Sequence, residues 1–100
     1  MQKVFTYGTL QNKEIQMELF GRILPGKLDQ LTGFKKEIII LGTNSYPILK
    51  LGDETSIIDG ICYEMTDEDL KNCDIYEGKE YQRILITLAS KQKAWVYIEA

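Results

Sequence analysis

Histidine is absent from the 100-residue sequence. Its absence excludes the Ser-His-Asp and Cys-His pairs of nucleophilic enzymes, the H-E-x-x-H metal site and acid–base catalysis by imidazole. A proton transfer in this protein therefore needs another group. A carboxylate is the first candidate, followed by lysine or tyrosine.

Basic charge, long apolar runs and cysteine are also scarce. The net charge is -3 and the pI is near 4.9, so we expect no nucleic-acid partner, which would need a basic patch. No apolar run approaches the ~20 residues of a membrane span, and we expect no signal peptide. Cys62 and Cys73 are too few for a disulfide framework or a tetrahedral zinc site. We therefore expect a reduced, cytoplasmic protein without a metal or a membrane partner.

The order of the elements indicates one α+β domain over residues 1–100. Apolar alternation and β-branched runs predict strands at 3–7, 34–41, 48–51, 57–65, 81–89 and 93–99. Residues 28–33 give a weaker signal, for either a further strand or a crossover. Two short helices are predicted at about 12–20 and 66–76, the first with Ile15 and Leu19 as its buried pair. The class is therefore α+β with a mostly antiparallel sheet that can curl into a barrel.

Single residues give local signals for these boundaries. Asn12 and Thr66 are typical helix N-caps, and the acids at 67–69 fit a first helical turn better than a metal site, because no further ligand completes an oxygen cage. Gly60 inside a strand indicates a bulge or the close approach of another backbone. Pro47 fits only the start of a strand or an edge strand. Turns are predicted at 52–54 and 90–92.

The stretch at 74–83, D-I-Y-E-G-K-E-Y-Q-R, carries an acid, a phenol and a guanidinium across a helix end and a strand start. One helical face holds Leu70, Cys73, Asp74 and Glu77. A carboxylate that continues this apolar stripe either emerges at the surface or is partly buried with a raised pKa. Tyr81 and Arg83 share one face of the next strand. On these residues alone, a helix cap followed by a solvated strand explains the stretch at least as well as a site.

A second stretch, Tyr7-Gly8-Thr9-Leu10, ends the first strand just before a helix. Successive backbone N–H groups in such a turn can form a concavity that binds anions. An ordinary strand-to-helix turn explains the four residues equally well. Neither the glycine spacing of a Walker loop nor that of a dinucleotide fingerprint is present.

Taken together and in order, these stretches resemble a known family. The chain contains, successively, K-V-F-T-Y-G-T-L, S-Y-P-I-L, D-G-I-C-Y-E-M-T, D-I-Y-E-G-K-E-Y-Q-R and A-W-V-Y-I. This set is similar to the gamma-glutamylcyclotransferase-like family, which includes the gamma-glutamylamine cyclotransferases, and the similarity runs from Val4 to Ile98. The resemblance implies a small mixed α/β barrel whose cavity holds the substrate. Cys73 departs from the family pattern, which usually has leucine before the aspartate.

The resemblance also implies a reaction and a site. The family cyclises a γ-glutamyl group to 5-oxoproline and expels an amine, with no cofactor, and its general base and acid is the glutamate that matches Glu77. The matching turn, Tyr7 to Leu10, would hold the α-carboxylate or the developing oxyanion through backbone N–H groups. Tyr81 is expected to support the cavity, whereas Asp74 and Arg83 are expected to be structural.

Two alternatives stay open at this point. Tyr46 and Pro47 either form a wall of the cavity or mark an edge strand. The chain is also short beside the family's glutathione-pathway members, which leaves little loop for a leaving-group pocket. A non-catalytic module that binds small molecules or a protein partner through the same barrel is therefore the alternative to an enzyme. The oligomeric state and the natural substrate are not specified by the sequence.

Overall fold

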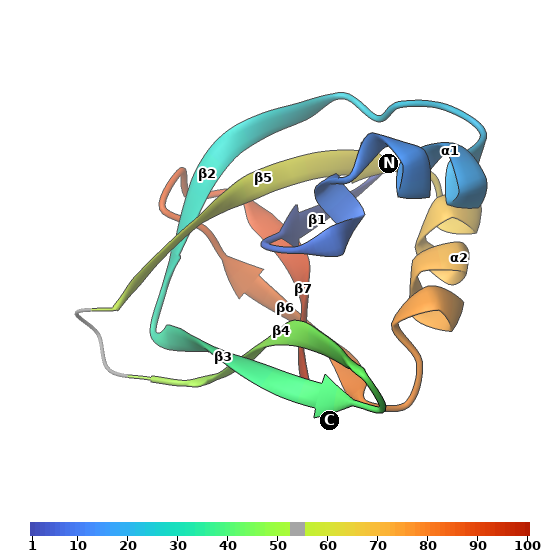
Figure 1. Cartoon of the computed structure of the whole chain (residues 1–100). Coiled ribbons are helices and arrows are strands. Elements are labelled where there is room, and N and C mark those ends of the chain that lie inside the picture. The colour runs from blue at the N-terminus through green and yellow to red at the C-terminus, as the bar shows by residue number, and fades with distance from the viewer. Residues whose placement is uncertain (53–55) are drawn as a thin grey trace.

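The computed structural model describes residues 1–52 and 56–100, and its elements follow the α+β order expected from the sequence (Figure 1). The turn predicted at 52–54 extends outside the described residues. The elements are β1 (Gln2–Thr6), the 3-10 helix η1 (Thr9–Gln11), α1 (Lys13–Phe20), β2 (Gly26–Thr32), β3 (Phe34–Leu41), β4 (Asn44–Leu51), β5 (Ile57–Met65), α2 (Asp67–Glu77), β6 (Tyr81–Thr87) and β7 (Lys93–Glu99). In the described part of the chain, no helix is long and apolar enough to cross a bilayer.

The strands form a five-stranded sheet and a two-stranded ribbon. The sheet has the order β2-β5-β1-β7-β6, and β3 pairs with β4 in the ribbon. Strand β1 runs antiparallel to β5 and parallel to β7, whereas β2–β5, β6–β7 and β3–β4 are antiparallel. The mostly antiparallel α+β prediction is therefore confirmed. The curved sheet and the ribbon enclose an interior without closing into a complete barrel (Figure 1).

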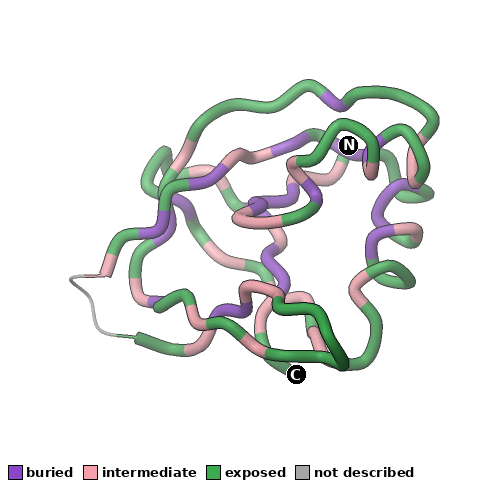
Figure 2. Tube along the Cα trace, viewed as in Figure 1, coloured by how far each residue is buried: buried purple, intermediate pink, exposed green. Residues whose placement is uncertain are grey.

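The central strands β1 and β7 are buried on both faces. Because side chains alternate along a strand, neighbouring residues of these strands enter two different core clusters. Val4 of β1 and Tyr97 of β7 join a core cluster that also takes residues from both helices. Their neighbours Phe5 and Val96 point the other way, into a second cluster that includes Phe34 and Leu49 of the ribbon. Helices thus cover one face of β1 and β7, and the ribbon covers the other, while much of the ribbon itself stays exposed (Figure 2).

Both predicted helix caps are confirmed. The side chain of Asn12 accepts hydrogen bonds from the backbone N–H groups of Glu14 and Ile15 at the start of α1. Thr66 and Asp69 form a reciprocal capping box at the start of α2. The Arg22 guanidinium bonds both oxygens of the Asp69 carboxylate, and this ion pair joins the segment after α1 to the start of α2. The entry of α2 is therefore fixed by three groups.

The buried position of α1 differs from the prediction. Ile15 and Leu19 are only half-buried, whereas the polar side chain of Gln16 is 1% exposed. Gln16 is satisfied there because it donates to the Leu10 carbonyl at 2.8 Å and accepts from the Leu24 N–H at 3.0 Å. A buried amide that meets two backbone groups can replace an apolar contact, because none of its polar atoms is left without a partner.

Two strands are longer than the sequence indicated. The weak signal at 28–33 becomes the seven-residue strand β2, which pairs along its whole length with β5. Strand β4 begins at Asn44, three residues before Pro47, which lies opposite Ile38 within the ribbon. Proline is tolerated there because each strand of a two-stranded ribbon has an unpaired edge, as the edge-strand interpretation required.

The two cysteines are free thiols, of which Cys62 is half-buried and Cys73 is buried. Cys73 is fully buried in the cluster under the helices, and burial raises the pKa of its thiol to about 12. Burial also raises the pKa of Cys62. Because the thiolate is the reactive form, neither cysteine is arranged as a nucleophile.

Gly60 confirms the expected close approach of another backbone. A Cβ atom at this position would lie 2.3 Å from the Thr6 carbonyl oxygen and 2.5 Å from the Phe5 ring. Both contacts belong to β1, the strand paired with β5. Only a residue without a side chain lets β5 lie this close to β1.

We predict that Gly60→Ala lowers the free energy of unfolding by about 2 to 3 kcal/mol, because the added methyl group must displace a backbone carbonyl and a buried ring. Urea unfolding of the two proteins measures the difference. Ile57→Val, at an exposed position of the same strand, is the control and should change stability by less than about 0.5 kcal/mol. A Gly60→Ala protein as stable as the wild type would show that the two strands can separate at no cost.

Candidate active site

Helix α2 places Glu77 at the mouth of the interior. Leu70 and Cys73 anchor the inner face of the helix in the core, and Glu77 is the last residue of the same helix. Gly78 follows with a φ of 75°, which lets the chain leave the helix and enter β6 three residues later. The predicted apolar stripe thus ends in a half-buried carboxylate.

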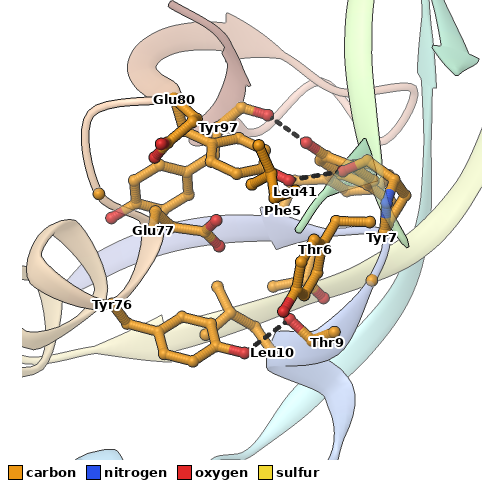
Figure 3. A pocket seen from close by; sticks show the side chains of 15 residues that line it. Phe5, Thr6, Tyr7, Thr9, Leu10, Leu41, Tyr76, Glu77, Glu80 and Tyr97 are labelled. Atoms are coloured by element: carbon orange, nitrogen blue, oxygen red, sulfur yellow. Dashed lines mark hydrogen bonds between the residues drawn. The ribbon is translucent and has the colours of Figure 1, made fainter. Parts of the chain in front are cut away.

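The Glu77 carboxylate is desolvated without being paired. Burial raises its pKa from the ordinary 4.5 to about 7. Among the described residues, it forms no hydrogen bond and no ion pair. Figure 3 shows the carboxylate pointing into a cavity between the rings of Tyr76 and Tyr97. A carboxyl group in this state can take up and release a proton near neutral pH.

The cavity around Glu77 has a volume of about 300 Å³ and brings together distant parts of the chain (Figure 3). This volume is at the lower end of the range for small-molecule sites. Its lining comes from residues 5–10, from Leu41, Tyr46 and Pro47 of the ribbon, from residues 76–78 at the end of α2, and from Glu80, Tyr81 and Tyr97. Five of the six tyrosines of the chain are in this lining.

The turn from Tyr7 to Leu10 forms the wall opposite the helix end. Gly8 packs against Pro47, where a Cβ atom would lie 2.8 Å from the proline ring. Thr9 accepts a hydrogen bond from the Tyr76 hydroxyl at 2.9 Å, which ties this turn to the residue before Glu77. In the described part of the chain, no acceptor takes the backbone N–H groups of Gly8, Thr9 or Leu10. The side chain of Leu10 itself belongs to the core.

Two tyrosines of the predicted site lock the cavity walls to one another. Tyr7 donates to the Tyr97 carbonyl at 2.6 Å, and burial is the main reason that its pKa is raised. Tyr81 donates to the Pro47 carbonyl at 2.8 Å, joining β6 to the ribbon. Burial, and then the nearby charge of Glu77, raise the pKa of Tyr81 to about 12. Both phenols therefore keep their protons at neutral pH.

Arg83 lies outside this cavity although it shares a strand face with Tyr81. Its guanidinium bonds both carboxylate oxygens of Asp74, at 2.9 and 3.0 Å, and stacks 4.2 Å from the centre of the Trp95 ring. Asp74 also accepts the Tyr97 hydroxyl at 2.6 Å. Although burial opposes it, these hydrogen bonds lower the pKa of Asp74. The pair holds α2 against β6 and β7 one turn before Glu77, as expected of structural residues.

Tyr76, Tyr97 and Glu80 are among the lining residues that sequence reasoning did not identify. Tyr76 and Tyr97 were visible only as members of the stretches Y-E-G and A-W-V-Y-I, and Glu80 had no signal of its own. The interpretation of Tyr46 and Pro47 as a cavity wall agrees with the structure, which places both in the lining.

Among the described residues, no group of three His, Cys, Asp or Glu side chains could hold a metal ion.

We predict that Glu77 makes stability depend on pH. Its raised pKa means that the folded protein binds the proton more tightly than the unfolded chain. The contribution of the protonated Glu77 carboxyl to the free energy of unfolding is therefore fully present below pH 4.5 and is lost as the pH rises through about 7. The free energy of unfolding of the wild type relative to Glu77→Gln should therefore fall by about 3 kcal/mol between pH 4.5 and 8. Urea unfolding across this range measures it.

Glu68→Gln provides the matched control, because Glu68 is an exposed acid on the same helix. Its stability difference from the wild type should stay nearly constant over the same range. If the Glu77→Gln difference is equally flat, the Glu77 carboxylate is solvated and the cavity is not the one described.

Comparison with known proteins gives the family and the fold. The family model for "Gamma-glutamyl cyclotransferase, AIG2-like" matches residues 4–100. The AIG2-like protein B of Arabidopsis thaliana is 26% identical over 94 residues, which are 94% of this chain and 54% of that protein. The chain thus spans about half the length of this curated relative.

Solved structures agree with this architecture. A solution structure of an Arabidopsis thaliana protein superposes with a TM-score of 0.81 at 24% identity, covering 98% of this chain and 68% of that one. The structure of an uncharacterized protein from Pyrococcus horikoshii has a TM-score of 0.72 at 19% identity, covering 99% and 78%. A gamma-glutamyl cyclotransferase structure has a TM-score of 0.79 at 14% identity, covering 99% and 66%. At these identities the structures show a shared fold, and the match of the family model shows that the chain belongs to the AIG2-like gamma-glutamyl cyclotransferase family.

Proposed function

We propose that this protein is a cyclotransferase that converts the γ-glutamyl group of a small γ-glutamyl amine or peptide into 5-oxoproline and releases an amine. The observation that carries the proposal is the unpaired Glu77 carboxylate, which faces a cavity of about 300 Å³. Burial raises the pKa of this group to about 7. Family membership supports this reaction class. The two free thiols support a reducing, cytoplasmic setting for it.

In the first step, Glu77 acts as a general base. Its carboxylate takes a proton from the α-ammonium of the γ-glutamyl group, which leaves a neutral amine. The nitrogen lone pair of this amine attacks the γ-carbonyl carbon of the same molecule, and a five-membered ring closes as the carbonyl oxygen becomes negative. Because both reacting groups belong to one substrate, holding that substrate folded supplies much of the rate. The small cavity supports this kind of positioning.

In the second step, Glu77 acts as a general acid. The carbon–nitrogen bond to the leaving amine breaks, the carbonyl re-forms, and the proton held by Glu77 goes to the leaving nitrogen. The ring nitrogen, which carries two protons after its attack, gives up the second one to the departing amine, which leaves as an ammonium. The carboxylate is thereby regenerated, and no water or cofactor is consumed. A group with a pKa near 7 suits both directions of transfer, since it is neither too weak a base nor too weak an acid at neutral pH.

The free N–H groups of Gly8, Thr9 and Leu10 are the donors available to negative charge in this cavity. They suit either the α-carboxylate of the substrate or the oxyanion of the ring-closing step. The hydroxyl groups of Tyr7 and Tyr81 donate hydrogen bonds to the Tyr97 and Pro47 carbonyls, respectively. We therefore assign these two tyrosines the role of shaping the substrate site.

We predict that Glu77→Gln abolishes most of the turnover. The amide keeps the shape of the side chain but cannot exchange the proton, so kcat should fall by about 10² to 10⁴-fold on a panel of γ-glutamyl amines and dipeptides. Formation of 5-oxoproline is the readout. Glu68→Gln, on the exposed side of the same helix, is the control and should retain full activity.

The same experiment separates catalysis from binding alone. Equal 5-oxoproline yields from the wild type and Glu77→Gln would remove Glu77 from its assigned role. A γ-glutamyl compound that raises the melting temperature of the wild type, with no 5-oxoproline formed from any member of the panel, would favour a non-catalytic binding module on the same fold.

A further inference from the structure

The charges of the Glu77 cavity all have one sign. Among the described residues that line it, the side chains with a formal charge are Glu77 and Glu80, and none is a lysine or an arginine. Arg83, the basic side chain that follows Tyr81 on the same strand face, is bound to Asp74 and stacked on the Trp95 ring. A substrate that enters this cavity therefore meets carboxylates and phenols but no cation.

Glu80 is held in place by its backbone while its carboxylate stays free. Its carbonyl accepts the Ala100 N–H at 3.1 Å, and one carboxylate oxygen lies 3.3 Å from where a Cβ atom would stand on Gly78. In the described part of the chain, this carboxylate has no hydrogen bond and no ion pair. Its negative charge also contributes, after burial, Glu77 and Tyr76, to the raised pKa of Tyr81. Glu80 is thus a lining residue whose carboxylate is unpaired and lies beside Gly78.

The position of Glu80 relative to Glu77 indicates which end of the substrate it meets. In Figure 3, Glu77 lies between Glu80 on one side and Thr9 and Leu10 on the other. If the γ-glutamyl unit lies between Glu77 and the N–H groups of residues 8–10, the substituent on the leaving nitrogen extends toward Glu80. Tyr81, the residue after Glu80 in the sequence, and Tyr46 also line the cavity.

We propose that Glu80 is a specificity-determining residue that selects leaving amines carrying a second, positively charged group, such as an aliphatic diamine. This inference rests on the proposed cyclotransferase function. An ammonium at the far end of the leaving group is attracted by the free carboxylate, and electron-rich tyrosine rings in the lining also favour a cation. A carboxylate at that position, as in a γ-glutamyl amino acid, is repelled by Glu80 and meets no lysine or arginine in the lining.

Three synthetic substrates of similar length test the charge preference. They are the mono-γ-glutamyl derivatives of 1,4-diaminobutane, pentylamine and 4-aminobutanoic acid, whose far ends carry an ammonium, a methyl and a carboxylate. For the wild type we expect kcat/KM for 5-oxoproline release to fall in that order, with about five- to tenfold between successive substrates, as for a partly exposed charge pair.

Variants of Glu80 assign the preference to this residue. Glu80→Gln should reduce the ratio of kcat/KM between the diamine and pentylamine derivatives to near one, and Glu80→Lys should favour the aminobutanoic acid derivative. Because each ratio is taken within one protein, a general loss of stability cancels. Glu18→Gln, at an exposed position of α1, is the matched control and should keep the wild-type ratios.

The outcomes separate this inference from the function on which it rests. Turnover of all three substrates by the wild type with equal kcat/KM would overturn the role of Glu80 and leave the cyclotransferase function standing. The same would follow if Glu80→Gln kept the wild-type ratios. Absence of 5-oxoproline from every substrate, including a wider panel of γ-glutamyl compounds, would overturn both.

Discussion

The site depends on keeping one carboxylate out of water without giving it a partner. For Glu77, a pKa raised from 4.5 to about 7 corresponds to a cost on the order of 3 kcal/mol when the group is charged. The surrounding contacts offset this cost and prevent the helix end from turning outward. Asp74, one turn earlier, is bound by Arg83 and Tyr97, and Tyr76, one residue earlier, is bound by Thr9. The anchors are thus hydrogen-bonded polar groups beside the site, while Glu77 itself is left free to react.

The fold explains why such a position exists. Strand β1 is buried on both faces, by the helices on one and by the ribbon on the other. Where β1 ends, at Thr6, these two layers come together around the turn of residues 7–10 and leave the cavity between them. Tyr7 and Tyr81 fix the gap, since each joins two elements through a carbonyl on the opposite side. The cavity is therefore a consequence of how the layers meet and needs no long specificity loop.

Local features of the fold could be predicted from the sequence, but partnerships between distant segments could not. Asn12 and Thr66 were correctly recognised as caps because a cap acts on residues two or three positions away. Gly60 signalled a close approach, yet its partner in β1 became known only from the pairing of β5 with β1. The burial of Gln16 was missed for the same reason, because the carbonyl of Leu10 and the N–H of Leu24 satisfy it across a bend in the chain.

The candidate site divides in a similar way. The helical stripe and the family resemblance together identified Glu77 and the turn from Tyr7 to Leu10, and all of these residues line one cavity. Glu80 could not be found, because a residue in a tight turn after a helix has no periodicity that shows where its side chain points. Spacing alone could not separate Tyr81 from Arg83, which the family resemblance did, since residues two apart on a strand share a face but need not share neighbours.

The central claim is that the γ-glutamyl group is displaced by its own amine and not by water. Turnover of a γ-glutamyl amine in water labelled with heavy oxygen, followed by mass spectrometry of the products, tests this most directly. The account predicts 5-oxoproline at its unlabelled mass, because the γ-carbonyl oxygen stays with the substrate throughout. Glutamate carrying the heavy oxygen would show hydrolysis, and would contradict the account.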